Sequence, residues 1–204
     1  MTGTANENGM LTAEINPAAL MQFTGIKTAE IGLALCQSRL LRPTLEHWLA
    51  ETLPALPDEL ETGERDLFAH LQCSGAQGLE QVARSVALLI NHRLIFLATD
   101  GALLRVLVQW CGCEKVVRHA ATAKIEGPQA ISPLSAFDQN DLMAQSRRIM
   151  GGLLGAMPEG YRARLTLRCD PESLPGVQRL TRADQKNLIS LAMTVSAFIV
   201  EEAG

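Results

Sequence analysis

Aromatic residues are scarce in this sequence. Phe, Trp and Tyr make up 4% of the 204 residues, and there is a single tyrosine. Proteins that stack nucleic-acid bases or sugar rings need several aromatic side chains on one surface, so the composition argues against both classes. Positive charge is not in excess either, because 18 Lys and Arg face 22 Asp and Glu, for a net charge of −4. Non-specific nucleic-acid binding needs a positive field, so we expect no nucleic-acid partner.

Long hydrophobic runs are also missing. The longest uncharged apolar stretch is LISLAMTVSAFIV, residues 188–200, whereas about 20 residues are needed to cross a bilayer. The first ten residues, MTGTANENGM, lack the basic start and apolar core of a signal peptide. We therefore expect no integral membrane segment and a cytoplasmic location.

Phosphate-binding loops are absent from the sequence, because neither G-x-x-x-x-G-K-[ST] nor a strand followed by G-x-G-x-x-G occurs. Gly151, Gly152 and Gly155 lie instead inside an apolar helical pattern. We interpret them as the frayed end of that helix, with a flexible joint or a close helix crossing as the alternatives. No cofactor is expected.

The five cysteines are an odd number, and without an export signal we expect reduced thiols. Cys111 and Cys113, with His119, form the one metal-like cluster, but zinc sites usually pair two such knuckles. Further ligands would have to come from elsewhere in the chain: His70, Cys73 and His92. We expect no metal site, and we interpret Cys111 and Cys113 as buried thiols beside a helix end. The alternative is a small thiol- or zinc-dependent enzyme that uses them.

Helical periodicity dominates what the sequence does contain. The clearest helix is predicted over 78–97, where apolar residues recur at three- and four-residue spacing. Because its other face is apolar too, we expect it at the centre of a multi-helix domain. Shorter helices are predicted over 17–23, 28–41, 44–49, 64–73, 102–110, 114–123, 135–154 and 181–202.

Residues 162–169, RARLTLRC, follow a different period. Apolar and polar residues alternate there, which is typical of a half-buried strand. A lone strand leaves its edges unpaired, so an extended segment lying on the helices is the alternative. The sequence therefore predicts an all-α or mainly α fold, a multi-helix bundle with at most one short β element around 162–169.

The predicted organisation has four parts: a disordered tail over 1–10, a helical domain over 11–126, a linker over 127–134, and a C-terminal helical portion over 135–204 packed on the first. The acid-rich stretch 58–66 is interpreted as a solvated loop, with a docking edge for a basic partner as the alternative.

Positive charge is most localised around Arg162, Arg164 and Arg168. We select these three as candidate partner-binding residues. A solvated face, or the nucleic-acid patch of a helical transcriptional regulator, are the alternatives. No catalytic, cofactor-binding or metal-ligating residue is predicted, and we expect no enzyme.

Two segments carry a family pattern. Residues 100–104 read D-G-A-L-L, and the hydrophobic helix that follows ends at Gly112. Later, residues 161–168 place an aromatic residue before R-L-x-L-R, as Tyr161, Arg164, Leu165, Leu167 and Arg168. In this the chain resembles the type III secretion sorting-platform accessory proteins, the SctK/YscK family. The resemblance covers about half of the chain.

The resemblance implies a mostly α-helical, non-enzymatic adaptor of a bacterial virulence machine. Such a protein would lie on the cytoplasmic side of the injectisome and be held at the inner membrane through a protein complex. Its partners would be the cytoplasmic domain of the secretion ring and the pod protein of the platform that carries the ATPase. We therefore predict a scaffold that works by shape and charge complementarity.

Overall fold

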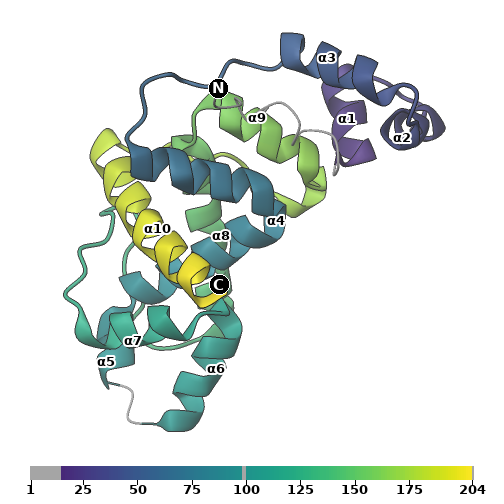
Figure 1. Cartoon of the computed structure of the whole chain (residues 1–204). Coiled ribbons are helices and arrows are strands. Elements are labelled where there is room, and N and C mark those ends of the chain that lie inside the picture. The colour runs from purple at the N-terminus through teal and green to yellow at the C-terminus, as the bar shows by residue number, and fades with distance from the viewer. Residues whose placement is uncertain (1–14, 98–99, 204) are drawn as a thin grey trace. The chain divides into compact units, whose positions relative to one another are not determined.

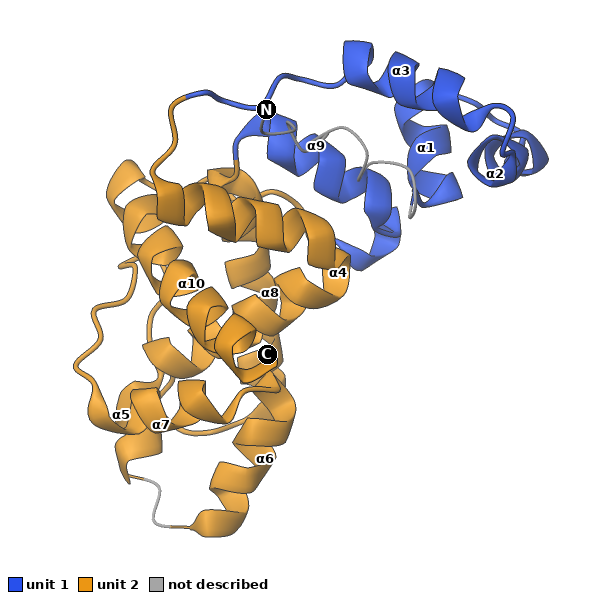
Figure 2. Ribbon diagram, viewed as in Figure 1, with its two compact units in different colours: residues 1–58, 158–174 blue, residues 59–157, 175–204 orange. Residues whose placement is uncertain are grey.

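A computed structural model describes residues 15–97 and 100–203. Within these ranges the chain forms ten α-helices and one short 3-10 helix, and no strand (Figure 1). The predicted all-α, multi-helix fold is therefore confirmed. The helices belong to two compact units (Figure 2), which we call unit 1 (residues 1–58 and 158–174) and unit 2 (residues 59–157 and 175–204). These boundaries differ from the division expected at 126 and 135, and the predicted tail over 1–10 lies outside the described residues.

Unit 1 contains α1 (Pro17–Thr24), α2 (Ala29–Gln37), α3 (Arg42–Thr52), α9 (Glu159–Arg168) and the 3-10 turn Pro171–Ser173. The helix α1 begins as predicted, because the Asn16 side chain accepts hydrogen bonds from the first-turn amides of Ala18 and Ala19 at 2.9 and 3.3 Å. A small apolar core joins these helices: Ile15, Leu20, Leu49, Leu53 and Leu167. Unit 1 therefore depends on α9, a segment more than 100 residues away in sequence from α3.

The predicted β element is wrong, because residues 162–168 lie in α9. Its buried side is made by residues spaced at three and four positions: Gly160, Tyr161, Arg164, Leu165 and Leu167. A helix satisfies its backbone hydrogen bonds internally, whereas a strand here would need a partner strand. Arg and Leu are also good helix formers. The alternation of Arg with apolar residues misled the prediction because one of the arginines is itself buried.

Unit 2 is built around α4 (Thr62–Ile90), which packs against α8 (Gln139–Ala156) and α10 (Arg182–Ala203). The second half of α4 is almost wholly buried, as expected for a helix that is apolar on most sides. Gly75 interrupts α4 with φ 63° and ψ −150°. The two helices predicted over 64–73 and from 78 onward therefore meet at this glycine.

The predicted helix 78–97 is shorter than expected, because α4 ends at Ile90 and a separate helix α5 (His92–Leu97) follows. Asn91 separates them and is buried. Its side-chain amide donates to the carbonyl oxygen of Ala87 at 2.8 Å and to the Gln145 side chain on α8 at 2.6 Å. This buried amide fixes the point where the chain leaves α4.

Two further helices complete unit 2 beside α5: α6 (Gly101–Cys111) and α7 (Glu114–Thr122). Asp100 caps α6 by accepting from the Ala102 amide at 2.8 Å, and Gly112 ends it with φ 70°, both as the sequence indicates. In Figure 1 these three helices lie together at one end of unit 2.

The segment predicted as a linker, 127–134, has no helix but is firmly attached within unit 2. Ile131 is only 1% exposed. The amide of Leu134 donates to the Asn91 side chain at 2.7 Å, and the amide of Gln129 donates to the Asp184 carboxylate at 2.6 Å. Asp184 also accepts from the Thr181 hydroxyl at 2.8 Å, so its carboxylate links this segment to the start of α10.

The glycines of α8 are not a frayed end, because Gly151, Gly152 and Gly155 lie within the helix. The extended residues 176–180 run close against them, and the amide of Gln178 donates to the carbonyl oxygen of Gly151 at 2.9 Å. A Cβ at Gly151 would lie 2.7 Å from the Gly176 carbonyl oxygen. Small residues are needed at Gly151 and Gly155 because another backbone approaches, and at Gly152 because the Leu180 and Leu188 side chains pack there.

None of the helices in the described ranges combines the length and the apolar content that spanning a lipid bilayer requires.

Candidate interaction surfaces

The three arginines chosen from the sequence have different environments in α9. Arg164 is 8% exposed, and its guanidinium donates to the carbonyl oxygens of Pro54 at 2.8 Å and Gly160 at 2.9 Å. Burial lowers its pKa. Arg164 thus holds α9 to the chain that follows α3, and it is not a surface residue. Arg162 and Arg168 are half-buried and stay candidate partner-binding residues.

The two cysteines of the metal-like cluster are buried at the junction of α6 and α7. The Cys113 thiol donates to the Glu202 carboxylate on α10 at 3.0 Å. Burial, together with that carboxylate, raises the pKa of Cys113 to about 11, and burial also raises the pKa of Cys111. Both thiols are therefore protonated at neutral pH, and a protonated thiol is a poor nucleophile.

The histidines named with that cluster make other contacts. The His119 ring lies against the Phe198 ring with centroids 5.2 Å apart. His92 Nδ1 lies 3.2 Å from the carbonyl oxygen of Leu89. His70 is half-buried, which lowers its pKa. Across residues 15–97 and 100–203, no three or more His, Cys, Asp or Glu side chains come together in a way that could hold a metal ion.

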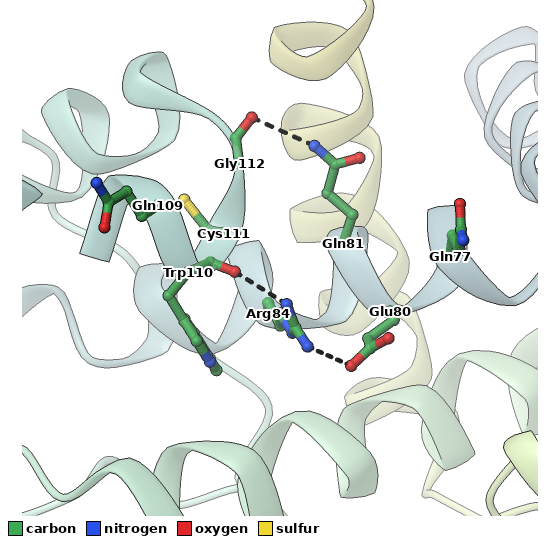
Figure 3. Close-up of a pocket in the computed structure, with 8 residues that line it drawn as sticks. All are labelled: Gln77, Glu80, Gln81, Arg84, Gln109, Trp110, Cys111 and Gly112. Atoms are coloured by element: carbon green, nitrogen blue, oxygen red, sulfur yellow. Dashed lines mark hydrogen bonds and ion pairs between the residues drawn. The ribbon is translucent and has the colours of Figure 1, made fainter. Parts of the chain in front are cut away.

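A polar hollow of about 250 Å³ lies between α4 and α6 in unit 2 (Figure 3). Gln81 donates from its side chain to the carbonyl oxygen of Gly112 at 3.3 Å, and Arg84 donates to that of Trp110 at 3.2 Å. Arg84 also pairs with Glu80 and lies 5.8 Å from the centre of the Trp110 ring. These polar groups are engaged in holding α6 against α4, so the hollow is explained by helix packing.

A larger and more apolar groove of about 510 Å³ lies between α6 and α7, also in unit 2. Apolar side chains from both helices line it: Leu104 and Val108 from α6, Val117 and Ala121 from α7. Arg105 and Arg118 line it as well, one from each helix. Glu114 of α7 lines the groove too and pairs with Arg118, so the groove combines an apolar floor with an arginine on the α6 side that pairs with no described carboxylate and an ion pair on the α7 side.

A third surface, which we call the α1–α3 surface, belongs to unit 1. It is a hollow of about 390 Å³ lined almost entirely by apolar and threonine side chains: Thr24, Ile26, Leu35, Leu41, Thr44, Leu45 and Trp48. Large apolar side chains are exposed on the same three helices and their connections, and we count them as part of this surface: Phe23, Ile31, Leu33, Leu40, Leu41 and Trp48. Phe23 and Trp48 form an edge-to-face pair with ring centroids 6.0 Å apart.

Sequence reasoning missed the α1–α3 surface. It predicted one helix over 28–41, whereas α2 ends at Gln37 and α3 already begins at Arg42. A signal was present, because α2 reads AEIGLALCQ and is apolar on all sides except the one shared by Glu30 and Gln37, although it is only nine residues long. A short helix cannot bury all of its faces in a unit of four short helices.

Comparisons of the chain with protein-family models, with curated proteins and with solved structures found no match.

Proposed function

We propose that this protein is a non-enzymatic adaptor that binds other proteins through the α1–α3 surface. Its place would be cytoplasmic, within a complex like the type III secretion sorting platform that the sequence resembles. The ring's cytoplasmic domain and the pod protein would be its partners.

The observation that carries the proposal is the concentration of exposed apolar side chains in unit 1. Of the twelve large apolar side chains exposed in the described residues, six lie between Phe23 and Trp48. Leu40 is 89% exposed, at the turn between α2 and α3. A concentration of exposed apolar side chains is typical of protein-interaction sites, since leaving them in water is unfavourable.

The shape of the α1–α3 surface supports a helical partner. The hollow lies among three short helices, and Trp48 and Leu41 line it. An amphipathic helix binds such a groove by inserting apolar residues spaced at three and four positions. Aromatic residues such as Trp48 commonly contribute most of the binding energy in contacts of this type.

The raised thiol pKa values of Cys111 and Cys113 support an adaptor over a thiol-dependent enzyme. Among the candidate arginines, Arg162 and Arg168 could extend a protein interface on α9.

The test uses the purified full chain with the ring cytoplasmic domain and the pod protein of the same bacterium. Leu33→Asp with Leu40→Asp should weaken binding by about tenfold or more, because a buried carboxylate would replace apolar contacts. Val177→Asp is the matched control, since Val177 is 53% exposed outside the helices in unit 2. Calorimetric titration measures the affinity, and circular dichroism verifies the fold.

Two results would contradict the proposal. If neither protein binds the wild-type chain, the assignment to a sorting platform fails. If binding occurs but the double substitution has no greater effect than Val177→Asp, the α1–α3 surface is not the docking site.

A further inference from the structure

The groove between α6 and α7 has the geometry of a helix-binding site. Leu104 and Val108 are four residues apart on α6, and Val117 and Ala121 are four residues apart on α7. Residues four apart form a ridge along a helix, so the two ridges border a channel into which a third helix can pack. Leu104 and Val108 are half-buried, so α6 keeps part of its apolar side uncovered.

The charges around this groove specify the kind of helix. The helices α5, α6 and α7 carry four Lys or Arg and one carboxylate, and two carboxylates of α10, Glu201 and Glu202, lie at the start of α7, where Glu201 pairs with Lys115. Arg118 pairs with Glu114 on the same helix. Arg105 donates to the carbonyl oxygen of Gly101 at 3.3 Å and has no ion pair with any described carboxylate. Its charge is therefore available to a partner.

We infer that the α6–α7 groove binds an acidic amphipathic helix of a partner protein. Apolar residues of that helix, spaced at i, i+3, i+4 and i+7, would lie on the ridges of α6 and α7. Asp or Glu residues beside this apolar stripe would pair with Arg105 on one side and compete with Glu114 for Arg118 on the other. The site goes beyond the proposed function, because it lies in unit 2 and uses none of the residues of the α1–α3 surface. It would give the chain a second attachment point.

A library of displayed helical peptides tests the chemistry of the occupant. Each 18-residue peptide keeps the same leucine stripe, and each flanking position is Glu, Lys or Gln. After selection on the immobilised full-length protein, we expect Glu to be enriched at positions beside the stripe. Enrichment of Lys, or no preference, would overturn the inference, and so would preferred binding of an RNA duplex by this groove.

Variants of the full chain then locate the site. Arg105→Glu should weaken the selected peptide by about tenfold in fluorescence anisotropy, and added salt should reduce that difference. Arg93→Glu is the matched control, since Arg93 is exposed on α5 but does not line the groove. Val108→Ala should weaken binding several-fold by removing methyl groups from the floor, and Leu40→Asp should leave it unchanged.

Hydrogen exchange on the complex gives an independent readout. Bound peptide should slow exchange in α6 and α7. Two results would contradict this site. One is slower exchange in α1–α3 in place of α6 and α7, and the other is equal affinity of the peptide for the Arg105→Glu and Arg93→Glu variants. Because the α1–α3 surface is tested with different residues and different ligands, either proposal can fail without the other.

Discussion

The Cys113 thiol donates a hydrogen bond to the Glu202 carboxylate across 89 residues of sequence, with sulfur and oxygen 3.0 Å apart. The same carboxylate accepts from the backbone amides of Glu114 at 3.2 Å and Lys115 at 3.3 Å. Glu202 therefore supplies a negative charge to the N-terminus of α7, where the first amides of a helix lack intrahelical partners. Lys115 also pairs with the neighbouring Glu201 at 3.1 Å. This contact attaches the end of α10 to α7.

Replacing Glu202 with Gln should lower the pKa of Cys113 from about 11 toward the usual thiol value of 9.0, because the negative charge beside the thiol is removed. The Cβ chemical shift of Cys113, followed by NMR as pH rises, measures this pKa. Glu201→Gln is the control, since Glu201 bonds to Lys115 and should leave the thiol pKa where it is. An unchanged pKa in Glu202→Gln would contradict the contact.

The same contact predicts how stability depends on pH. The folded state holds the Cys113 proton more tightly than the unfolded state, so this contribution is complete below pH 9.0 and is lost as pH rises to about 11. Hydrogen bonds from the thiol and the α7 amides lower the pKa of Glu202, so its contribution is present above its usual 4.5 and is lost in more acidic solution. Urea denaturation from pH 3 to 11 should show both losses, and Glu202→Gln should reduce them.

Arg164→Ala should destabilise the protein by about 1–3 kcal/mol, because the carbonyl oxygens of Pro54 and Gly160 each lose a buried donor. Arg39→Ala, at an exposed position in unit 1, should change the free energy of unfolding by less than about 0.5 kcal/mol. Urea denaturation measures both. If the two variants have equal free energies of unfolding, Arg164 is not a buried structural residue and becomes a candidate partner-binding residue again.

Gly75→Ala should cost about 1–3 kcal/mol, because φ 63° with ψ −150° is a backbone conformation that residues with a Cβ rarely adopt. Space is not the reason, since an added Cβ would meet no described atom within 4 Å. Gly101→Ala is a matched control with equally open surroundings but a helical backbone, and it should be neutral or stabilising by about 0.5–1 kcal/mol. Thermal unfolding of both variants separates backbone strain from packing, and a neutral Gly75→Ala would show that α4 is continuous.

Gly155→Ala should destabilise unit 2 by about 1–3 kcal/mol, because the new methyl group would collide with the backbone carbonyl of Gln178. Gly176→Ala, in the opposing segment, has no described atom within 4 Å of an added Cβ and should be close to neutral. The pair of melting temperatures checks whether residues 176–180 lie against α8. A stabilised Gly155→Ala would instead favour the frayed helix end inferred from sequence.

Local sequence signals located many of the helices. Asn16 and Asp100 cap α1 and α6 close to the predicted starts of these helices, because their side chains accept from amides only two or three residues away. Gly112 ends α6 for an equally local reason, since it adopts φ 70°. The buried half of α4 was also recognisable, because apolar residues on all sides exclude a surface helix.

Contacts between residues far apart in the sequence could not be predicted from such local signals. Arg164 was assigned to the surface because its charge is visible in the sequence while its partner Pro54 is 110 residues away. Gly155 looked like a frayed end because the sequence does not show which backbone approaches it. The α1–α3 surface was missed because the exposure of a helix depends on whether another segment packs over it, and the sequence does not show which segments do.

The sequence alone determined the helical fold class and several helix ends, because each depends on residues within one or two turns. Tertiary structure decided the rest: that residues 162–168 are helical and belong with α1–α3, that Cys113 meets Glu202, and that two apolar grooves stay open. These features depend on which distant segments pack together. Distant segments pack in the arrangement that buries the apolar side chains of the whole chain, and local sequence patterns do not show that arrangement.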